Sequence, residues 1–322
     1  MYLLTGANGF IGSVLLGYLN RQGITDVILV DDFQHYEDKE PNLAGKEYLV
    51  KVERDTLFAI WDQEQWPVRG VYHLGARTDT TETDSGIFDR LNLAYSKSIW
   101  ERCTRWNIPL VYASSAATYG DGSQGFDDGI HPSALRPLNA YGRSKNDFDA
   151  WALGQREVPP AWYGLKFFNV YGPNEYHKGR MASVVWHTYR QVLATGKMNL
   201  FRSHRPDFAD GEQSRDFIHV LDLCRVCHFL MEQQPGPYGL YNLGTGAARS
   251  FRDLASETFR AMGLDPDIRF IDTPADLRAN YQYFTQADMA RLRAAGYTRP
   301  FLTLEEGIED YVKHHLQPQA YY

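Results

Sequence analysis

The sequence predicts an α/β fold in which a doubly wound parallel sheet carries helices on both faces. Short apolar runs alternate with helical patterns through the first half of the 322-residue chain. Three glycines follow the first apolar run at intervals of three residues, and two acids close the second run. Strand–helix alternation of this kind is typical of parallel sheets. With 43% hydrophobic residues, the chain can also bury a large core.

Six apolar runs in the first half are interpreted as strands, and helical patterns fill most of the gaps between them. The strands are expected at 2–5, 26–31, 48–52, 70–76, 109–115 and 161–170, and the helices at 10–22, 86–106 and 141–155. After residue 170 the alternation loosens. Helices are expected there at 179–195, 220–233, 250–262, 285–295 and 303–315, with short strands near 198–201, 215–219 and 239–243.

This change of pattern predicts two domains. The first covers 1–170, to which later segments can return, and a smaller C-terminal α/β domain covers 171–322. Two polar loops, 121–129 and 201–216, are long enough to act as lids or clamps over a site.

The stretch TGANGFIG, residues 5–12, connects the first predicted strand to the first predicted helix. Glycines permit a tight turn and close approach of backbone to ligand, and N–H groups at the helix start can then face a pyrophosphate. The second predicted strand ends in Asp31, followed by Asp32, where an acid commonly binds the ribose of an adenosine. The context predicts a Rossmann-type dinucleotide site rather than an ordinary turn.

A second motif, Tyr141-Gly-Arg-Ser-Lys145, lies on the predicted helix 141–155. Side chains four residues apart share a helix face, and a nearby ammonium group favours the phenolate. Lowering a tyrosine pKa from about 10 to about 7 requires roughly 4 kcal/mol. Ser115 ends the strand 109–115, at the sheet edge where open α/β sheets bind ligands. Taken alone, the motif could also be an exposed tyrosine and a solvated lysine.

Seven motifs together resemble the extended short-chain dehydrogenase/reductase family. They are TGANGFIG, HLGA (73–76), SSAATYG (114–120), YGRSK (141–145), FNVYGP (168–173), RDFIHVLD (215–222) and YNLGTG (241–246), in the family's order over almost the whole chain. The resemblance implies a nucleotide-activated sugar as substrate. It also implies Tyr141 as acid/base, Lys145 as its electrostatic partner and a nicotinamide-ribose contact, and Ser115 as hydroxyl donor to the reacting oxygen.

The residues after Ser115 bear on the reaction. Family members that dehydrate sugars typically place an Asp-Glu pair there, whereas this chain has Ala116 and Ala117. Dehydration is therefore disfavoured. Epimerisation remains, because it requires only removal of a hydride, reorientation of the ketone and return of the hydride.

One branch of the family gives a narrower resemblance, carried by the segments 138–145, 169–184, 283–297 and 300–308. This branch inverts C6 of an ADP-linked heptose, a precursor of the lipopolysaccharide inner core, and keeps NADP bound. C6 lies outside the sugar ring, so rotation about C5–C6 presents the other face of the ketone to the same hydride. Each epimer needs its own acid/base, and the resemblance assigns these roles to Tyr141 and Lys178.

Lys178 can act as a base only if its pKa falls from about 10.4 towards neutrality, through burial and nearby positive charge. The alternative interpretation of Lys178 is a solvated lysine at a helix start. The resemblance favours the catalytic interpretation.

Further contacts follow from the motifs and the resemblance. Cofactor contacts are expected at Gly6, Gly9, Phe10, Ile11, Gly12, Asp31, Asp32, Lys39, Lys51, Leu74, Gly75, Ala76, Arg77, Thr78, Asn92, Tyr141, Lys145, Val170 and Lys178. Substrate contacts are expected at Ser115, Asn169, Arg180, His187, Phe201, Arg202, Ser203, His204, Arg215 and Tyr281. Arginine suits a diphosphate because its planar fork can bind phosphate with two donors.

The chain departs from the branch at two places. Arg180 stands where the best-known members have serine, and HLGARTDTTE (73–82) differs near the nicotinamide, so Arg77 and Asp79 receive no defined role. The acids after the second strand alone favour NAD, since they repel a 2′-phosphate. Lys39 and Lys51 match family positions that neutralise this phosphate, so we expect NADP, with NAD as the alternative.

Composition limits the other function classes. A net charge of −7 argues against a nucleic-acid surface, and no apolar run approaches the roughly 20 residues of a membrane span. Three cysteines indicate a reducing compartment, which we expect to be the bacterial cytoplasm. Cys224 and Cys227 form a single C-x-x-C in a helical pattern, which predicts packing rather than a metal site.

Two other functions are compatible with the motifs. An NAD-dependent UDP-hexose 4-epimerase would share Tyr141, Lys145 and Ser115 but give Lys178 no catalytic role. A non-catalytic dinucleotide sensor would usually lack the tyrosine or the lysine. The resemblance also implies a homo-oligomer, since family members often assemble as pentamers.

Overall fold

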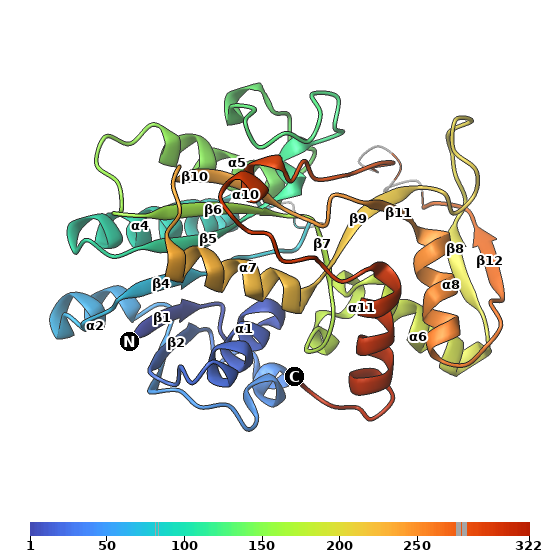
Figure 1. Ribbon diagram of the computed structural model, residues 1–322, viewed down its shortest axis with the longest axis horizontal. Coiled ribbons are helices and arrows are strands. Elements are labelled where there is room, and N and C mark those ends of the chain that lie inside the picture. Colours follow the sequence, from blue (N-terminus) through green and yellow to red (C-terminus); the bar gives the residue numbers. More distant parts are fainter. Residues whose placement is uncertain (81, 83, 275–277, 279–281) are drawn as a thin grey trace.

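The computed structural model describes residues 1–80, 82, 84–274, 278 and 282–322. Seven parallel strands form the main sheet in the order β10-β6-β5-β4-β1-β2-β3 (Figure 1). They are β1 (Tyr2–Thr5), β2 (Val27–Asp31), β3 (Val50–Glu53), β4 (Gly70–His73), β5 (Leu110–Ser115), β6 (Trp162–Phe167) and β10 (Gly239–Leu243). The order runs outward from β1 in both directions, which confirms the predicted doubly wound fold.

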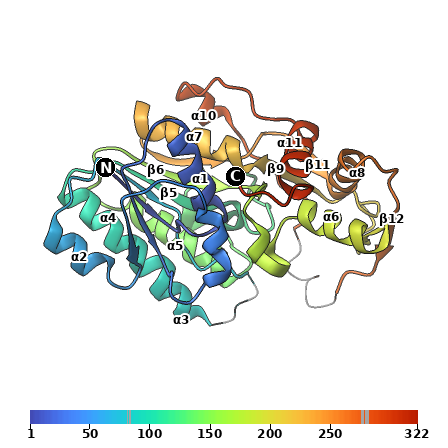
Figure 2. The ribbon, with the colours of Figure 1, turned by 90° about the horizontal axis from the view of Figure 1, so that it is seen from below.

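Helices cover both faces of this sheet (Figure 2). One face carries α1 (Phe10–Arg21) and α7 (Val220–Gln233), and the other carries α2 (Leu57–Glu64), α4 (Tyr95–Arg105) and α5 (Ala140–Leu153). Strand side chains alternate between the two faces. Leu4 accordingly packs in the core beneath α1 and α7, whereas Leu3 packs with Trp61 and Trp100 on the opposite side. Because both cores are apolar, the strands read as continuous hydrophobic runs.

The single strand predicted at 161–170 is wrong. β6 ends at Phe167, and the chain then enters β7 (Asn169–Tyr171), which belongs to a second sheet of order β11-β9-β7. Its other members are β9 (Ser214–His219) and β11 (Ala248–Ser250). Phe168 is buried at the change of sheet and donates its N–H to the Leu243 carbonyl at 3.1 Å. Asn169 is the one polar residue at the break, and neither a glycine nor a proline marks it.

A third sheet pairs β8 (Met198–Phe201) with β12 (Ile268–Ile271) in parallel. Around it lie α6 (Val184–Thr195) and α8 (Phe251–Ala261), and α11 (Leu304–Tyr311) packs against α8. The predicted helix 179–195 is shorter than expected. Residues Tyr176–Met181 form a separate 3₁₀ turn, with Gly179 at φ +52°, and the Ser183 side chain caps α6 at the Trp186 N–H.

Other expectations also need correction. The helix predicted at 86–106 consists of α3 (Ser85–Phe88), a π turn (Asp89–Ala94) and α4. The helix predicted at 285–295 is reduced to α10 (Ala290–Ala294), and α2, β11 and β12 were not predicted. Two elements beyond residue 170 return to the first part of the chain. Strand β10 belongs to the main sheet, and α7 belongs to the helix layer that covers one of its faces. Cys224 and Cys227 are both buried in α7, which confirms that they pack in the core.

Candidate functional site

Two of the three glycines after β1 are required by contacts within the chain itself. Gly6 has φ +70°, and a Cβ there would lie 2.7 Å from the Gly75 backbone. A Cβ at Gly12 would lie 2.0 Å from the Gly6 carbonyl oxygen. Gly9 is different, because a Cβ would meet only that carbonyl, at 3.3 Å. Gly9 begins α1 without a side-chain cap, so the first N–H groups of α1 remain available to an anion.

Asp31, the last residue of β2, and Asp32, which follows it, make different contacts. The Asp31 carboxylate accepts hydrogen bonds from the N–H of Asn8 at 2.9 Å and of Asp32 at 2.8 Å, and so holds the glycine turn against β2. Asp32 pairs with Arg54 at 3.2 Å and with His35 at 2.6 Å. Burial alone would raise the Asp32 pKa, but His35 and Arg54 lower it. Arg54, which directly follows β3, is therefore a further charged residue beside Asp32 in the candidate site.

The two expected phosphate lysines lie in different surroundings. The Lys39 ammonium lies 3.7 Å from the centroid of the Tyr36 ring. The Lys51 ammonium pairs with Glu40 at 2.7 Å. Burial acts to lower the Lys51 pKa, but Glu40 and Tyr48 outweigh it and raise this pKa. Any 2′-phosphate near Lys51 must therefore share this ammonium with the Glu40 carboxylate.

The segment after β4 is held by buried polar side chains. Thr5 Oγ1 accepts from the Gly75 N–H at 3.0 Å and lies 2.7 Å from Nδ1 of His73. Asn92, in the π turn, accepts from the Arg77 N–H at 2.8 Å and donates to the Arg77 carbonyl at 3.0 Å. It also donates to Ser144 Oγ at 3.0 Å. In the structure Asn92 thus connects the 74–78 backbone to α5.

Tyr141 and Lys145 occupy the first turns of α5, which Asn139 caps through the Gly142 N–H at 2.7 Å. Burial raises the Tyr141 pKa, and a hydrogen bond with Ser115 opposes this rise. Lys145 donates to the Ala113 carbonyl at 2.9 Å, and burial lowers the Lys145 pKa to about 8. The structure thus brings the serine and the tyrosine together as expected, but burial dominates the phenol, whose pKa is raised rather than lowered.

Lys178 reaches the site from a distant segment. Its ammonium lies 5.2 Å from the ring centroid of Phe10, the first residue of α1. Burial lowers the Lys178 pKa, which is the direction that a basic role requires. The neighbour that acts on it is the Glu175 carboxylate, which opposes the fall, and not the positive charge that was also considered. Glu175 is itself fully buried and accepts from the N–H and the hydroxyl of Ser183, each at 2.6 Å. These bonds fix the turn that carries Lys178.

A cavity of about 440 Å³ lies between α6 and the third sheet. Its walls are mostly apolar and include two expected substrate residues, His187 and Phe201; the other lining residues are Val184, Gln191, Met198, Asn199, Leu200, Gln213, Phe251 and Ile271. The guanidinium of Arg215 lies 5.4 Å from the Phe251 ring centroid and so adjoins this cavity. An apolar chamber beside a buried arginine fits a flat base joined to phosphate.

The remaining expected substrate residues are less enclosed. Arg202 pairs with Asp210 at 3.2 Å and with Asp272 at 3.0 Å. The His204 ring nitrogen Nδ1 lies 2.8 Å from the hydroxyl of Tyr283, and the Ser203 hydroxyl donates to the Arg205 carbonyl. Asn169 is exposed and Val170 partly exposed on β7, and the exposed Arg180 approaches His187 through its carbonyl at 3.3 Å. Tyr281 lies outside the described residues.

The chain is similar to known proteins over most of its length. The family described as "NAD dependent epimerase/dehydratase family" matches residues 2–244. The chain belongs to the NAD dependent epimerase/dehydratase family. The ADP-L-glycero-D-manno-heptose-6-epimerase of Nitratidesulfovibrio vulgaris (strain Hildenborough) is 46% identical over 98% of each chain, and that of Fusobacterium nucleatum is 44% identical over 100% of each. The crystal structure of the Helicobacter pylori ADP-L-glycero-D-manno-heptose-6-epimerase has a TM-score of 0.80 at 26% identity, over 97% of this chain and 95% of that one.

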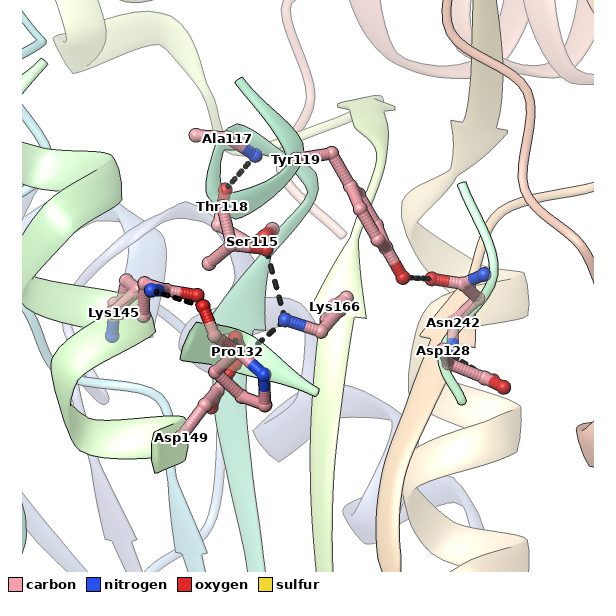
Figure 3. Close-up of polar contacts among 12 residues, drawn as sticks. Ser115, Ala117, Thr118, Tyr119, Asp128, Pro132, Lys145, Asp149, Lys166 and Asn242 are labelled. Atoms are coloured by element: carbon pink, nitrogen blue, oxygen red, sulfur yellow. Dashed lines mark hydrogen bonds and ion pairs between the residues drawn. The ribbon is translucent and has the colours of Figure 1, made fainter. Parts of the chain in front are cut away.

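Within this NAD dependent epimerase/dehydratase fold, sequence reasoning missed several buried polar residues. Asp149 and Lys166 form an ion pair of 2.8 Å beneath Lys145 (Figure 3). Asp128, in the polar loop 121–129, accepts from the Asn242 N–H at 2.7 Å, and burial raises its pKa to about 6. The spacing could have pointed to Asp149, since it lies four residues after Lys145 and therefore on the same face of α5.

Asp216, the first of the two acids in the RDFIHVLD motif, was also not predicted to have a role. Its carboxylate accepts from the N–H and hydroxyl of Thr245 and from the N–H groups of Gly246 and Ala287, at 2.7–3.0 Å. Burial raises the Asp216 pKa, and these donors oppose the rise. One buried carboxylate therefore joins β9 to two later loops of this family member.

Proposed function

We propose that the protein inverts C6 of ADP-glycero-manno-heptose through transient oxidation to a 6-keto intermediate. The observation that carries the proposal is the presence of two partly buried acid/base candidates, Tyr141 beside Ser115 and Lys178 near Phe10. One fixed base cannot easily reach a hydroxyl that changes sides, whereas two bases approaching from separate segments can. The near-full-length relatives support the ADP-linked heptose over the UDP-hexose alternative.

The chain's residues fit a nicotinamide dinucleotide. The uncapped start of α1 at Gly9 suits the pyrophosphate, and Asp32 with Arg54 lies where the adenosine ribose is expected. When bound, the dinucleotide supplies the acceptor and donor of hydride. The remaining groups of the site act on protons and on position.

In one epimer, Tyr141 takes the proton of the C6 hydroxyl, and Ser115 donates a hydrogen bond to the reacting oxygen. The charge on Lys145 favours the ionised phenol. Rotation about C5–C6 then presents the other face of the ketone, and Lys178, in its ammonium form, donates its own proton to the oxygen of the opposite epimer. Exchange with solvent afterwards removes the proton held by Tyr141 and reprotonates Lys178. The Lys178 amine must be neutral to accept a proton in the reverse direction, and burial favours that form.

The substrate assignment predicts interconversion of the two C6 epimers of ADP-heptose without net consumption of cofactor. The apolar cavity with Phe201 and the adjoining Arg215 would hold the ADP portion. Epimer ratios can be followed by NMR of the anomeric and C6 protons, with UDP-glucose as the competing substrate. Turnover of UDP-glucose combined with inactivity on ADP-heptose would replace this proposal with the hexose 4-epimerase.

We propose NADP rather than NAD as the bound form. Purified protein should bind NADP more tightly, because Lys39 and Lys51 can offset the charge of a 2′-phosphate near Asp32. Changing both lysines to alanine should remove this preference and leave NAD binding intact, as measured by calorimetry. Lys197→Ala with Lys313→Ala is the matched control, with the same loss of charge elsewhere. Stronger binding of NAD by the unaltered protein would refute the assignment.

We also propose that residues 1–170, with α7 and β10, bind the dinucleotide, while the rest of 171–322 binds the sugar nucleotide. A homo-oligomer in the bacterial cytoplasm, supplying heptose for the lipopolysaccharide core, is the context we propose for this activity. None of the described helices is both long and apolar enough to cross a membrane.

A further inference from the structure

The helix face that carries Tyr141 and Lys145 continues, four residues later, to Asp149. Asp149 is fully buried. Its carboxylate accepts from the Ser114 hydroxyl at 2.6 Å, the Tyr112 hydroxyl at 3.1 Å and the Lys166 ammonium at 2.8 Å. Three donors from β5 and β6 thus hold one carboxylate beneath the proposed catalytic pair.

Lys166 is equally buried and completes a small network (Figure 3). Its ammonium also donates to Thr118 Oγ1 at 2.9 Å and lies 5.2 Å from the Tyr119 ring centroid. Thr118 in turn donates to the carbonyl of Ser115 at 2.8 Å. The network therefore contacts the backbone of the proposed hydroxyl donor as well as the helix of the acid/base.

A buried ion pair is weak evidence for stability, since an apolar pair of similar volume is often at least as stable. The placement of this pair is more informative. Asp149 follows Lys145 by one turn on the same face of α5 and pairs with the ammonium of Lys166 on β6. It influences Lys145 electrostatically, although it makes its direct ion pair with Lys166.

We propose that Asp149 is a positioning residue that keeps Lys145 charged inside the buried site, while Lys166 limits how strongly the same carboxylate opposes ionisation of Tyr141. The inference deepens the proposed function and rests on it for the role of Lys145. It adds to the tyrosine–lysine pair a third charged residue on the same helix face, which acts through its neighbours without touching substrate.

The groups around this cluster are few. Lys145 faces the Ala113 carbonyl and acts on His73, whose pKa is lowered to about 3, mainly by burial and also by Lys145, so that His73 is neutral. Asp149 faces Tyr112 and Lys166, and it also raises the pKa of Tyr119. Burial keeps both tyrosines protonated at neutral pH. Among these groups, only two ammonium ions and one carboxylate are charged at that pH.

The direction of the effect follows from the signs. Burial lowers the Lys145 pKa to about 8, and Asp149 opposes that fall. Asp149 also adds to the raised pKa of Tyr141. Asp149→Asn removes the negative charge, so both pKa values should fall. Activity that rises as Tyr141 ionises and falls as Lys145 loses its proton should therefore move, as a whole, to lower pH.

The test measures the lysine directly and so does not depend on the substrate. The ¹³Cε resonance of Lys145, assigned by its loss in Lys145→Arg, is titrated by NMR in the dinucleotide-bound protein. We expect Asp149→Asn to lower the Lys145 pKa by about 1, the lower end of the range for one nearby charge. Asp149→Glu should restore most of it. An unchanged Lys145 pKa in Asp149→Asn would overturn the inference.

Two further variants keep the result interpretable. Asp222→Asn is the matched control, since Asp222 is also fully buried and paired, with Arg225 at 2.6 Å, but away from this cluster. It should leave the Lys145 titration unchanged. If Asp149→Asn does not fold, the double variant Asp149→Asn with Lys166→Met removes both charges and leaves no unpaired ammonium. It should show a smaller fall in the Lys145 pKa, because the Lys166 charge that offsets Asp149 is removed as well. A Lys145 pKa that does not fall in this variant would equally refute the inference.

The pH–rate profile separates this inference from the proposed function. A profile displaced to lower pH in Asp149→Asn supports the inference, and a general loss of rate at unchanged pH optimum contradicts it. If the unaltered protein is inactive on ADP-heptose while the Lys145 titration shifts as expected, the proposed substrate fails and the charge relation stands.

Discussion

Replacing Tyr141 with phenylalanine should slow epimerisation of ADP-heptose by about 10²–10⁴-fold, the usual contribution of a general acid/base. The variant loses only the phenol oxygen, which in the structure hydrogen-bonds Ser115. The ring remains, 6.5 Å from the Phe88 centroid, so the packing of α5 should be preserved. The rate is measured by epimer ratio over time, and dinucleotide binding by calorimetry should remain close to that of the unaltered protein.

Tyr163→Phe is the matched control for this change. Tyr163 lies on β6 and donates to the Pro235 carbonyl at 2.8 Å, away from the proposed site. It should lose a comparable hydrogen bond and keep its rate. If Tyr141→Phe turns over within a few-fold of the control, Tyr141 is not the acid/base.

Lys178→Met should produce a loss of the same order, about 10²–10⁴-fold, because it removes the second base. Methionine retains an unbranched apolar side chain near Phe10, and the Glu175–Ser183 bonds that fix the turn are untouched. Single-turnover reduction of the bound cofactor should still occur with the epimer that Tyr141 serves. Tyr141→Phe should show the complementary preference.

Lys97→Met controls for loss of an ammonium near an aromatic ring. The Lys97 ammonium lies 5.2 Å from the Trp151 ring centroid, the same separation as Lys178 from Phe10. It lies on α4 and should not affect the rate. Epimerisation by Lys178→Met at the rate of the unaltered protein would contradict the two-base mechanism and leave a single-tyrosine epimerase.

The sequence was sufficient for the parts of this protein that depend on local pattern. The first five strands, the glycine turn and the serine–tyrosine pair could all be predicted, because strand–helix alternation and a fixed motif spacing set them. The division of 161–170 between β6 and β7 could not, since Phe168 is buried and apolar like Phe167 before it, and Asn169 alone does not mark a change of sheet. The change of sheet depends on the bond from Phe168 to Leu243, a residue 75 positions away.

The buried ion pair between Asp149 and Lys166 could not be predicted for a similar reason. Lys166 sits in an apolar strand, and a lone lysine there suggests exposure until its partner is known. That partner is Asp149, whose helix reaches β6 only in the folded chain. The raised pKa of Tyr141 was also missed, because the charge beside a phenol can be read from spacing whereas its burial cannot.

The carboxylate of Asp216 has a consequence for the order in which the protein becomes functional during synthesis. Its donors include Ala287, and in the same region the Asp288 N–H donates to the Phe126 carbonyl at 3.3 Å. The main sheet can form while the ribosome is still translating, since chains tend to fold from the N-terminus. The loop near Phe126 and Asp216 on β9 receive these bonds only after residues 287 and 288 have emerged, close to the end of synthesis. On the division of the chain proposed above, the dinucleotide-binding segments of a nascent chain fold before the sugar-binding segments are complete.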